Sequence, residues 1–151
     1  MPVVGYTCGV FDLFHVGHVN LLRNAKARCD VLIAAVTVDE LVAYKGKQAV
    51  IPFEDRIQVV RACKYVDSAV PQRSIDKVEA WHKLKFDILF VGDDWYGNPK
   101  WKDFEARLAE QGVVVVYIPY TEHVSSTKLR TVLGAVREDV ENTAVVKTGV
   151  Q

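Results

Sequence analysis

Short apolar runs alternate with longer amphipathic segments along this chain. The runs at residues 3–8 and 31–37 are apolar and bounded by polar or turn residues, which predicts buried strands, and the segment from about 17 to 29 between them has a helical spacing of apolar residues. Pro52 favours a helix start, because its missing N–H costs nothing in the first turn. The further elements predicted, in chain order, are a helix over 52–65, a short strand near Ala69, a helix over 75–84, a strand over 88–91, a helix over 102–110, a strand over 113–118 and a helix from Ser125 or Ser126 to about Val136.

This alternation of strands and helices determines the fold class that we expect. Strands separated by helices form a parallel sheet covered on both faces, with right-handed connections. We therefore predict an α/β fold, a Rossmann-like doubly wound parallel sheet of about five strands in three α/β/α layers. One domain should span residues 1–137, and the polar, aperiodic residues 138–151 should form a C-terminal tail that is flexible or docked on a partner.

Polar residues follow three of the predicted strands, at 9–18, 92–95 and 121–127. In open parallel sheets, ligands bind beyond the carboxyl ends of the strands, where the strand order reverses. These three segments are therefore the candidates for a binding site.

Composition restricts the classes of partner. Lys plus Arg and Asp plus Glu number 19 each, so net charge gives no reason to expect nucleic acid or a membrane as partner, and an anion site must be local. The three cysteines lack the paired spacing of a zinc site, and their odd number, with no signal peptide, predicts a cytoplasmic protein rather than a disulfide framework. No apolar run reaches membrane-spanning length.

The densest group of candidate residues lies between the first predicted strand and helix. His15 and His18 are three residues apart at a helix start, which places them on one face. Unpaired backbone N–H groups and the positive end of the helix dipole lie there too, so the two imidazoles and the amides form an anion site, and Gly17 lets a phosphate come close. Two alternatives are a zinc pair, disfavoured because His82 and His123 show no ligand spacing, and two ordinary surface or core histidines.

The run Gly-x-Phe-Asp-x-x-His-x-Gly-His after a first strand resembles the cytidylyltransferase-like branch of the nucleotidyltransferase superfamily, and is most similar to the small glycerol-3-phosphate cytidylyltransferases. The similarity extends to about Arg137, through residues 37–40, 45–47, 54–56, 65–67, 92–95 and 121–128. It implies a cytidylyltransferase that moves CMP from CTP to a small phosphorylated or phosphonylated acceptor and releases pyrophosphate. It also implies a homodimer, and Mg²⁺ that is carried by the triphosphate rather than by a protein metal site.

The resemblance assigns a role to each candidate residue. His15, His18 and Lys45 are expected to be catalytic; because the attacking phosphate is already ionised, they serve to position groups and neutralise charge. The residues expected at the nucleotide are Gly9, Val10, Phe11, Asp12, Gly17, Asp94, Thr121, Ser125, Ser126 and Thr127. The residues expected near the acceptor are Lys47, Arg56, Lys64, Trp95 and Tyr120. For Arg56 the sequence leaves a second possibility open, a structural pairing with Asp55 or Glu54.

The chain departs from the family pattern at three positions. Tyr120 stands where the family has an arginine, and a tyrosine supplies neither the charge nor the fork of donors. Val10 replaces a threonine and Lys64 replaces another arginine. The candidates that could supply the missing guanidinium or an equivalent contact are Arg73, Arg130 and His123.

Two other functions stay open at this stage. An adenylyltransferase of the same superfamily would use the same chemistry with a different base pocket. A regulatory module that binds nucleotide without catalysis would explain the missing arginine, but the retained His15, His18 and Lys45 argue against it.

Overall fold

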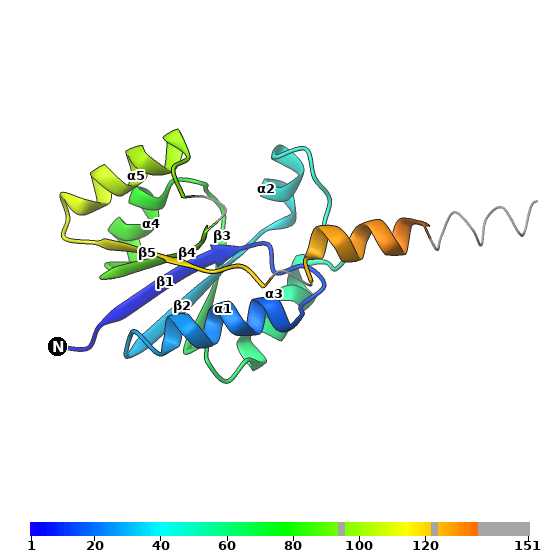
Figure 1. Ribbon diagram of the computed structural model, residues 1–151, viewed down its shortest axis with the longest axis horizontal. Coiled ribbons are helices and arrows are strands. Elements are labelled where there is room, and N and C mark those ends of the chain that lie inside the picture. The colour runs from blue at the N-terminus through cyan, green and yellow to red at the C-terminus, as the bar shows by residue number, and fades with distance from the viewer. Residues whose placement is uncertain (94–95, 122–123, 136–151) are drawn as a thin grey trace, which may run out of the picture.

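The computed structural model describes residues 1–93, 96–121 and 124–135. Its centre is a parallel sheet of five strands in the order β3-β2-β1-β4-β5 (Figure 1). The strands are β1 (Val4–Gly9), β2 (Val31–Thr37), β3 (Ser68–Gln72), β4 (Ile88–Gly92) and β5 (Val114–Ile118). The order reverses at β1, which pairs with β2 on one side and β4 on the other, so the predicted doubly wound sheet is confirmed.

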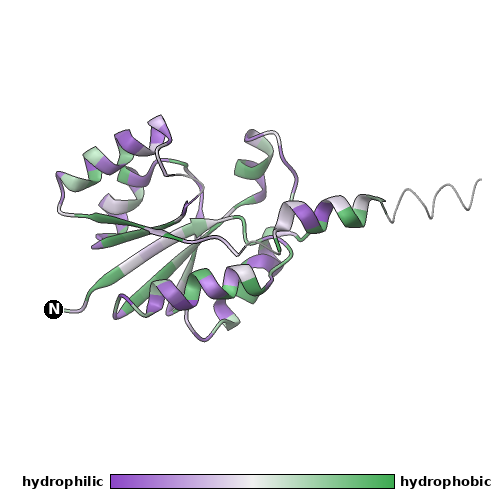
Figure 2. Ribbon diagram, in the orientation of Figure 1, coloured by the Kyte–Doolittle hydropathy of each residue, from purple (hydrophilic) through white to green (hydrophobic). Residues whose placement is uncertain are grey.

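Helices cover both faces of the sheet. On one face, α1 (Val16–Lys26) and α3 (Phe53–Ala62) pack over a core that includes Leu22, Leu32 and Val60. On the other, α4 (Lys77–Leu84) and α5 (Pro99–Ala109) pack around Phe86 and Leu108. In Figure 2, β2 and β5 are mostly green, whereas α1 alternates green and purple, as one buried and one exposed helix face require.

Two helices lie apart from these layers. The short helix α2 (Asp39–Tyr44) follows β2. A helix over 126–135 projects away from the sheet (orange in Figure 1). None of the described helices is long and apolar enough to cross a membrane. The predicted tail at residues 138–151 lies outside the described residues.

Side-chain caps explain where the predicted helix boundaries were displaced. α5 starts three residues before the predicted Lys102, because the Asn98 side chain accepts from Lys100 N at 3.0 Å and Pro99 occupies the first turn. α4 starts two residues after the predicted start because Asp76 caps it, accepting from Val78 N at 2.9 Å.

Candidate active site

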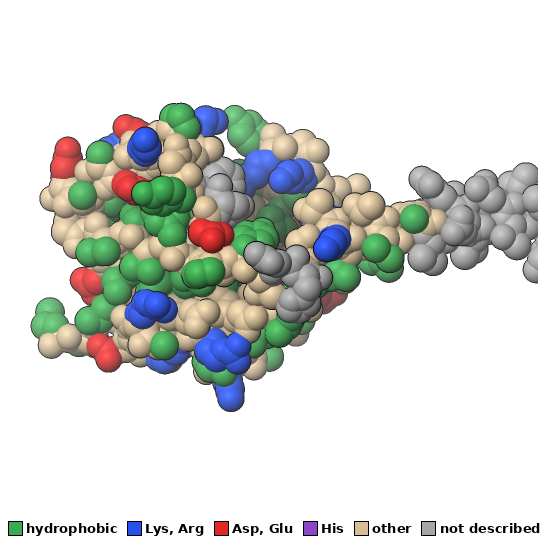
Figure 3. All heavy atoms as spheres, viewed as in Figure 1, with side chains coloured by type: hydrophobic (Ala, Val, Ile, Leu, Met, Phe, Trp, Pro, Cys, Tyr) green, Lys and Arg blue, Asp and Glu red, His purple; other side chains and the backbone are tan. Residues whose placement is uncertain are grey.

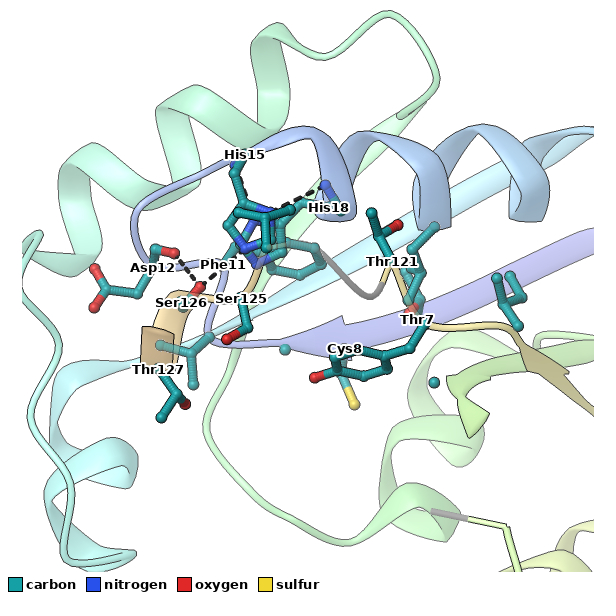
Figure 4. Close-up of a pocket in the computed structure, with 18 of the residues that line it drawn as sticks. Thr7, Cys8, Phe11, Asp12, His15, His18, Thr121, Ser125, Ser126 and Thr127 are labelled. Atoms are coloured by element: carbon teal, nitrogen blue, oxygen red, sulfur yellow. Dashed lines mark hydrogen bonds between the residues drawn. The ribbon is translucent and has the colours of Figure 1, made fainter. Parts of the chain in front are cut away.

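A cavity of about 280 Å³ opens at the carboxyl ends of β1 and β5, beside the start of α1 (Figure 4). It lies where the strand order reverses, as expected of a doubly wound sheet. Two segments far apart in sequence form its walls, the loop after β1 and the stretch after β5. The predicted site residues that line it are Gly9, Val10, Phe11, Asp12, His15, Gly17, His18, Tyr120, Thr121, Ser125, Ser126 and Thr127.

The two histidines form a reciprocal cap at the start of α1. His15 is the N-cap residue, and its Nδ1 accepts from Gly17 N at 3.0 Å. His18 Nδ1 accepts in turn from His15 N at 3.1 Å (Figure 4). Because each Nδ1 is an acceptor, each neutral ring carries its proton on Nε2. The cap therefore leaves two Nε2–H donors in the cavity wall, and that of His15 lies 3.5 Å from Ser126 Oγ.

Packing keeps both imidazoles uncharged. The His15 and His18 ring centroids are 4.0 Å apart, and His18 stacks on Phe14 at 5.2 Å. Burial lowers the pKa of His15. Burial and then the adjacent His15 lower the pKa of His18 to about 4, against the opposing effect of Asp12. At neutral pH the two rings are therefore hydrogen-bond donors and not cations, so positive charge for a triphosphate must come from other groups.

Gly17 makes the cap possible. A Cβ at this position would lie 2.7 Å from His15 Cε1 and 2.9 Å from His15 Nδ1, closer than real contacts allow. The sequence suggests a glycine that admits a phosphate; the structure adds that the glycine lets the His15 ring fold back over the helix start.

Asp12 lines the cavity, but its carboxylate is engaged by protein groups. Its oxygens accept from Val50 N at 2.9 Å and Ile51 N at 3.0 Å, and Arg130 Nη1 lies 3.0 Å from Oδ2. Burial acts to raise the pKa of Asp12, but these two amides and Arg130 outweigh it and hold the pKa below its ordinary value. Its carbonyl also accepts from Ser126 Oγ at 2.5 Å, which joins the two walls of the cavity.

Lys45 and Lys47 are exposed and are not among the residues that line the cavity. They flank Gly46, which has φ +74°, just after α2. Desolvation and the charges of Lys77 and Lys47 lower the pKa of Lys45, and Cys8 opposes them. Figure 3 shows basic side chains gathered at α2.

Arg56 has a structural role, the second of the two possibilities that the sequence left open. Its side chain is 1% exposed, and its donors reach Ile51 O, Val10 O and Thr37 O at 2.7–2.8 Å and Asp39 Oδ1 at 2.6 Å. The expected acceptor contact is therefore corrected to an internal role, and the acidic partner is Asp39 rather than a neighbour in its own helix turn.

Lys64 also lies away from the cavity. It sits between α3 and β3, at the amino edge of the sheet, and its ammonium is 5.2 Å from the centroid of the Tyr65 ring. Because the cavity opens at the carboxyl edge, the expected acceptor contact of Lys64 is corrected as well. Asp94, Trp95 and His123 lie outside the described residues.

Arg130 is the one arginine among the described residues that line the cavity. Its Nη1 pairs with Asp12 and its Nη2 lies 3.3 Å from Thr127 Oγ1. Of the candidates that could replace the guanidinium missing at Tyr120, Arg130 is thus in place, whereas Arg73 is absent from the lining.

Cys8 and Asn20 are among the residues of this site that sequence reasoning missed. Cys8 is the second-last residue of β1 and lines the cavity. Asn20 Nδ2 donates to Thr121 Oγ1 at 3.1 Å and joins the two walls. The position of Cys8, directly before the predicted loop, was a signal for the first. Nothing in the local sequence marks Asn20, because its partner is 101 residues away.

The sequence matches the family described as Cytidylyltransferase-like over residues 6–132. The chain belongs to the cytidylyltransferase-like family. The match covers both cavity walls, from β1 into the helix over 126–135, so the histidine cap, the Lys45 loop and Arg130 all fall within the matched residues.

The relatives of this cytidylyltransferase-like chain include proteins named as cytidylyltransferases and as FAD synthases. It is 36% identical over 131 residues to the glycerol-3-phosphate cytidylyltransferase of Bacillus subtilis (strain 168), a match that covers 82% of this chain and 92% of the relative. It is 34% identical over 139 residues to the FAD synthase of Pyrococcus abyssi, covering 86% and 89%. The relatives named as cytidylyltransferases are nucleotidyltransferase enzymes, and this chain is one as well.

A solved structure shares the fold. The lipopolysaccharide core biosynthesis protein from Thermoplasma volcanium GSS1 matches with a TM-score of 0.68 at 22% identity, covering 82% of this chain and 100% of that one. At this identity the likeness establishes the Rossmann-like fold and no more.

Proposed function

We propose that this chain transfers CMP from CTP to a small phosphorylated or phosphonylated acceptor. A phosphate oxygen of the acceptor bonds to the α-phosphorus of CTP, the bond from that phosphorus to the oxygen bridging to the β-phosphate breaks, and pyrophosphate leaves. The observation that carries the proposal is the pair of Nε2–H donors that the reciprocal cap leaves on His15 and His18, two residues that line the cavity.

The chemistry asks for donors and positive charge rather than for proton transfer. The charge that builds up on the transferred phosphoryl oxygens is stabilised by donors already held in place, which need no reorganisation as the reaction proceeds. In this proposal His15 and His18 donate to the triphosphate, the start of α1 adds the positive end of the helix dipole, and Arg130 supplies a guanidinium.

Lys45 has a different place in the proposal. Its long, exposed side chain on the loop after α2 and its lowered pKa suit a cation that reaches the phosphates once they are bound. Mg²⁺ would arrive with the triphosphate and neutralise part of its charge; among the described residues no three His, Cys, Asp or Glu side chains gather as a metal site.

CTP as donor and a phosphopolyol related to glycerol 3-phosphate as acceptor have their support in relatives that carry glycerol-3-phosphate cytidylyltransferase names at 33–36% identity. Tyr120 in place of the family arginine supports an acceptor with altered contacts, which keeps a phosphonate among the candidates. We further propose a homodimer, on the resemblance alone.

A second candidate, adenylyl transfer, has its support in relatives named FAD synthase at 34–37% identity. Its chemistry at the cavity is the same, and only the base pocket differs.

Pyrophosphate release tests the proposal and separates it from the alternative. The protein is incubated with Mg²⁺, each of the four nucleoside triphosphates in turn, and a panel of phosphorylated and phosphonylated acceptors. We expect release with CTP that depends on an acceptor. Release with ATP alone would replace the proposal by adenylyl transfer, and release with no pair would refute both. Gel filtration with light scattering tests the dimer.

A further inference from the structure

We infer that Asp12 and Arg56 are a pair of positioning residues that hold the end of the loop carrying the two lysines, residues 45–51, against the histidine segment. The backbone of the lysine loop, as we call residues 45–51, is thereby fixed relative to the histidine segment. The inference rests on the proposed function for what the lysines do there, but its geometry stands on the contacts of the two buried side chains.

Both side chains hydrogen-bond to the backbone of the same residue, Ile51. Ile51 N donates to Asp12 Oδ1 at 3.0 Å, and Ile51 O accepts from Arg56 Nε at 2.8 Å. Val50 N donates to the second oxygen of Asp12 at 2.9 Å. Asp12 and Arg56 are each 1% exposed, so two full charges are buried to satisfy three consecutive backbone groups.

The other ends of the pair are fixed to the sheet edge. Arg56 Nη1 donates to Val10 O at 2.7 Å and to Thr37 O at 2.8 Å, and its Nη2 pairs with Asp39. Val10 precedes the histidines by a few residues, and Thr37 ends β2. The lysine loop is therefore joined through the Arg56 side chain to the segment that follows β1 and to the last residue of β2.

The loop needs such an anchor because it has little packing of its own. Residues 45–48 are exposed, and the contacts that hold residues 45–47 are backbone bonds to α2. Burying an unpaired charge is costly, and a well-packed apolar pair gives at least as much stability as a buried ionic one. The use of two buried charged side chains to bind backbone groups is therefore better explained by the placement of the loop than by a gain in stability.

Asp12 also links this anchor to the cavity arginine. Its Oδ2 accepts from Val50 N and from Arg130 Nη1, so a single carboxylate sets the positions of the lysine loop and of the guanidinium opposite. A displacement of about 1 Å in a group that acts on the transition state costs about 100-fold in rate. Loss of the anchor should therefore lower kcat more than it changes KM.

The test uses Asp12→Asn, which keeps one acceptor oxygen and turns the other into a donor that opposes Val50 N–H or Arg130. We expect kcat to fall about 10- to 100-fold with KM for CTP changed less than about 3-fold. In the Asp12→Asn background, Lys45→Ala should lower kcat little further, since both substitutions act through the lysine loop. Additive losses in the double variant would overturn the inference.

Asp67→Asn is the matched control. Asp67 also accepts from a backbone amide, Leu32 N at 2.7 Å, and from Lys26 Nζ at 2.7 Å, but it lies at the amino edge of the sheet. This variant should lose stability and keep kcat. An equal fall of kcat in Asp67→Asn and Asp12→Asn would show a general structural effect and overturn the inference.

Amide hydrogen exchange gives a readout that does not depend on activity. In the wild type, the amides of Val50 and Ile51 should exchange at least 100-fold more slowly than that of Gln48, and Asp12→Asn should abolish this difference. Fast exchange at Val50 and Ile51 in the wild type would refute the anchor even where Asp12→Asn fails to fold. If protection is present but no nucleotide and acceptor pair releases pyrophosphate, the proposed function fails while the anchor stands.

Discussion

Replacing His15 by Asn separates the two tasks of this ring. The ring caps α1 through Nδ1 and offers a donor through Nε2. An asparagine Oδ1 can take the place of Nδ1, because Asn is among the best N-cap residues, but nothing in Asn reaches the position of Nε2. Alanine loses both groups. The pair His15→Asn and His15→Ala therefore differs by the cap alone.

The magnitudes follow from the two contacts. Loss of a donor to developing charge costs about 10²- to 10³-fold in kcat, and both variants should show it. Loss of a cap costs about 1 kcal/mol, which for a chain of this size lowers Tm by about 2–4 °C, and only His15→Ala should show it. Steady-state pyrophosphate release and thermal unfolding by circular dichroism measure the two effects on the same samples. Wild-type kcat in His15→Asn, or equal Tm values for His15→Ala and His15→Asn, would refute the reasoning.

Three further predictions concern the same cavity. Gly17→Ala should lower both Tm and kcat, because its Cβ would lie 2.7 Å from His15 Cε1; unchanged values of both would show that the cap tolerates a side chain. The pKa of His18 is lowered to about 4, so its contribution to the free energy of unfolding is complete above its unfolded pKa of about 6.5 and is lost as pH falls toward 4, by at most about 3 kcal/mol. Between pH 7 and pH 5, urea unfolding should therefore show a smaller loss of stability for His18→Asn than for the wild type. Equal losses of stability would contradict this prediction. Tyr120→Arg should change kcat less than about 3-fold if Arg130 already supplies the guanidinium, whereas a gain of 10-fold or more would show that the loss is uncompensated.

The fold and the site location could be predicted because they depend on local patterns. Alternating apolar runs gave the layers, and polar residues after strands pointed to the carboxyl edge. The early start of α5 was also readable, since Asn98-Pro99 is a cap followed by a favoured first-turn residue. Boundary errors of this kind come from weighting periodicity above caps.

What could not be predicted depends on partners that are distant in sequence. The donors of Arg56 reach Val10, Thr37 and Asp39, and no local rule chooses these over Asp55 or Glu54. The reason for Gly17 is the fold-back of a ring two residues before it, which appears only once the His15 side chain is placed.

Phosphorus NMR gives the most direct test of the central claim that the histidine cap serves nucleotidyl transfer. The full chain is mixed with Mg²⁺, CTP and the acceptor that gives the fastest pyrophosphate release, and the spectra are followed with time beside those of His15→Asn. We predict that CTP disappears as pyrophosphate and a CDP-linked product appear in equal amounts, at least about 100-fold more slowly with His15→Asn. Formation of inorganic monophosphate from CTP in place of pyrophosphate, or equal rates for the wild type and His15→Asn, would contradict the claim.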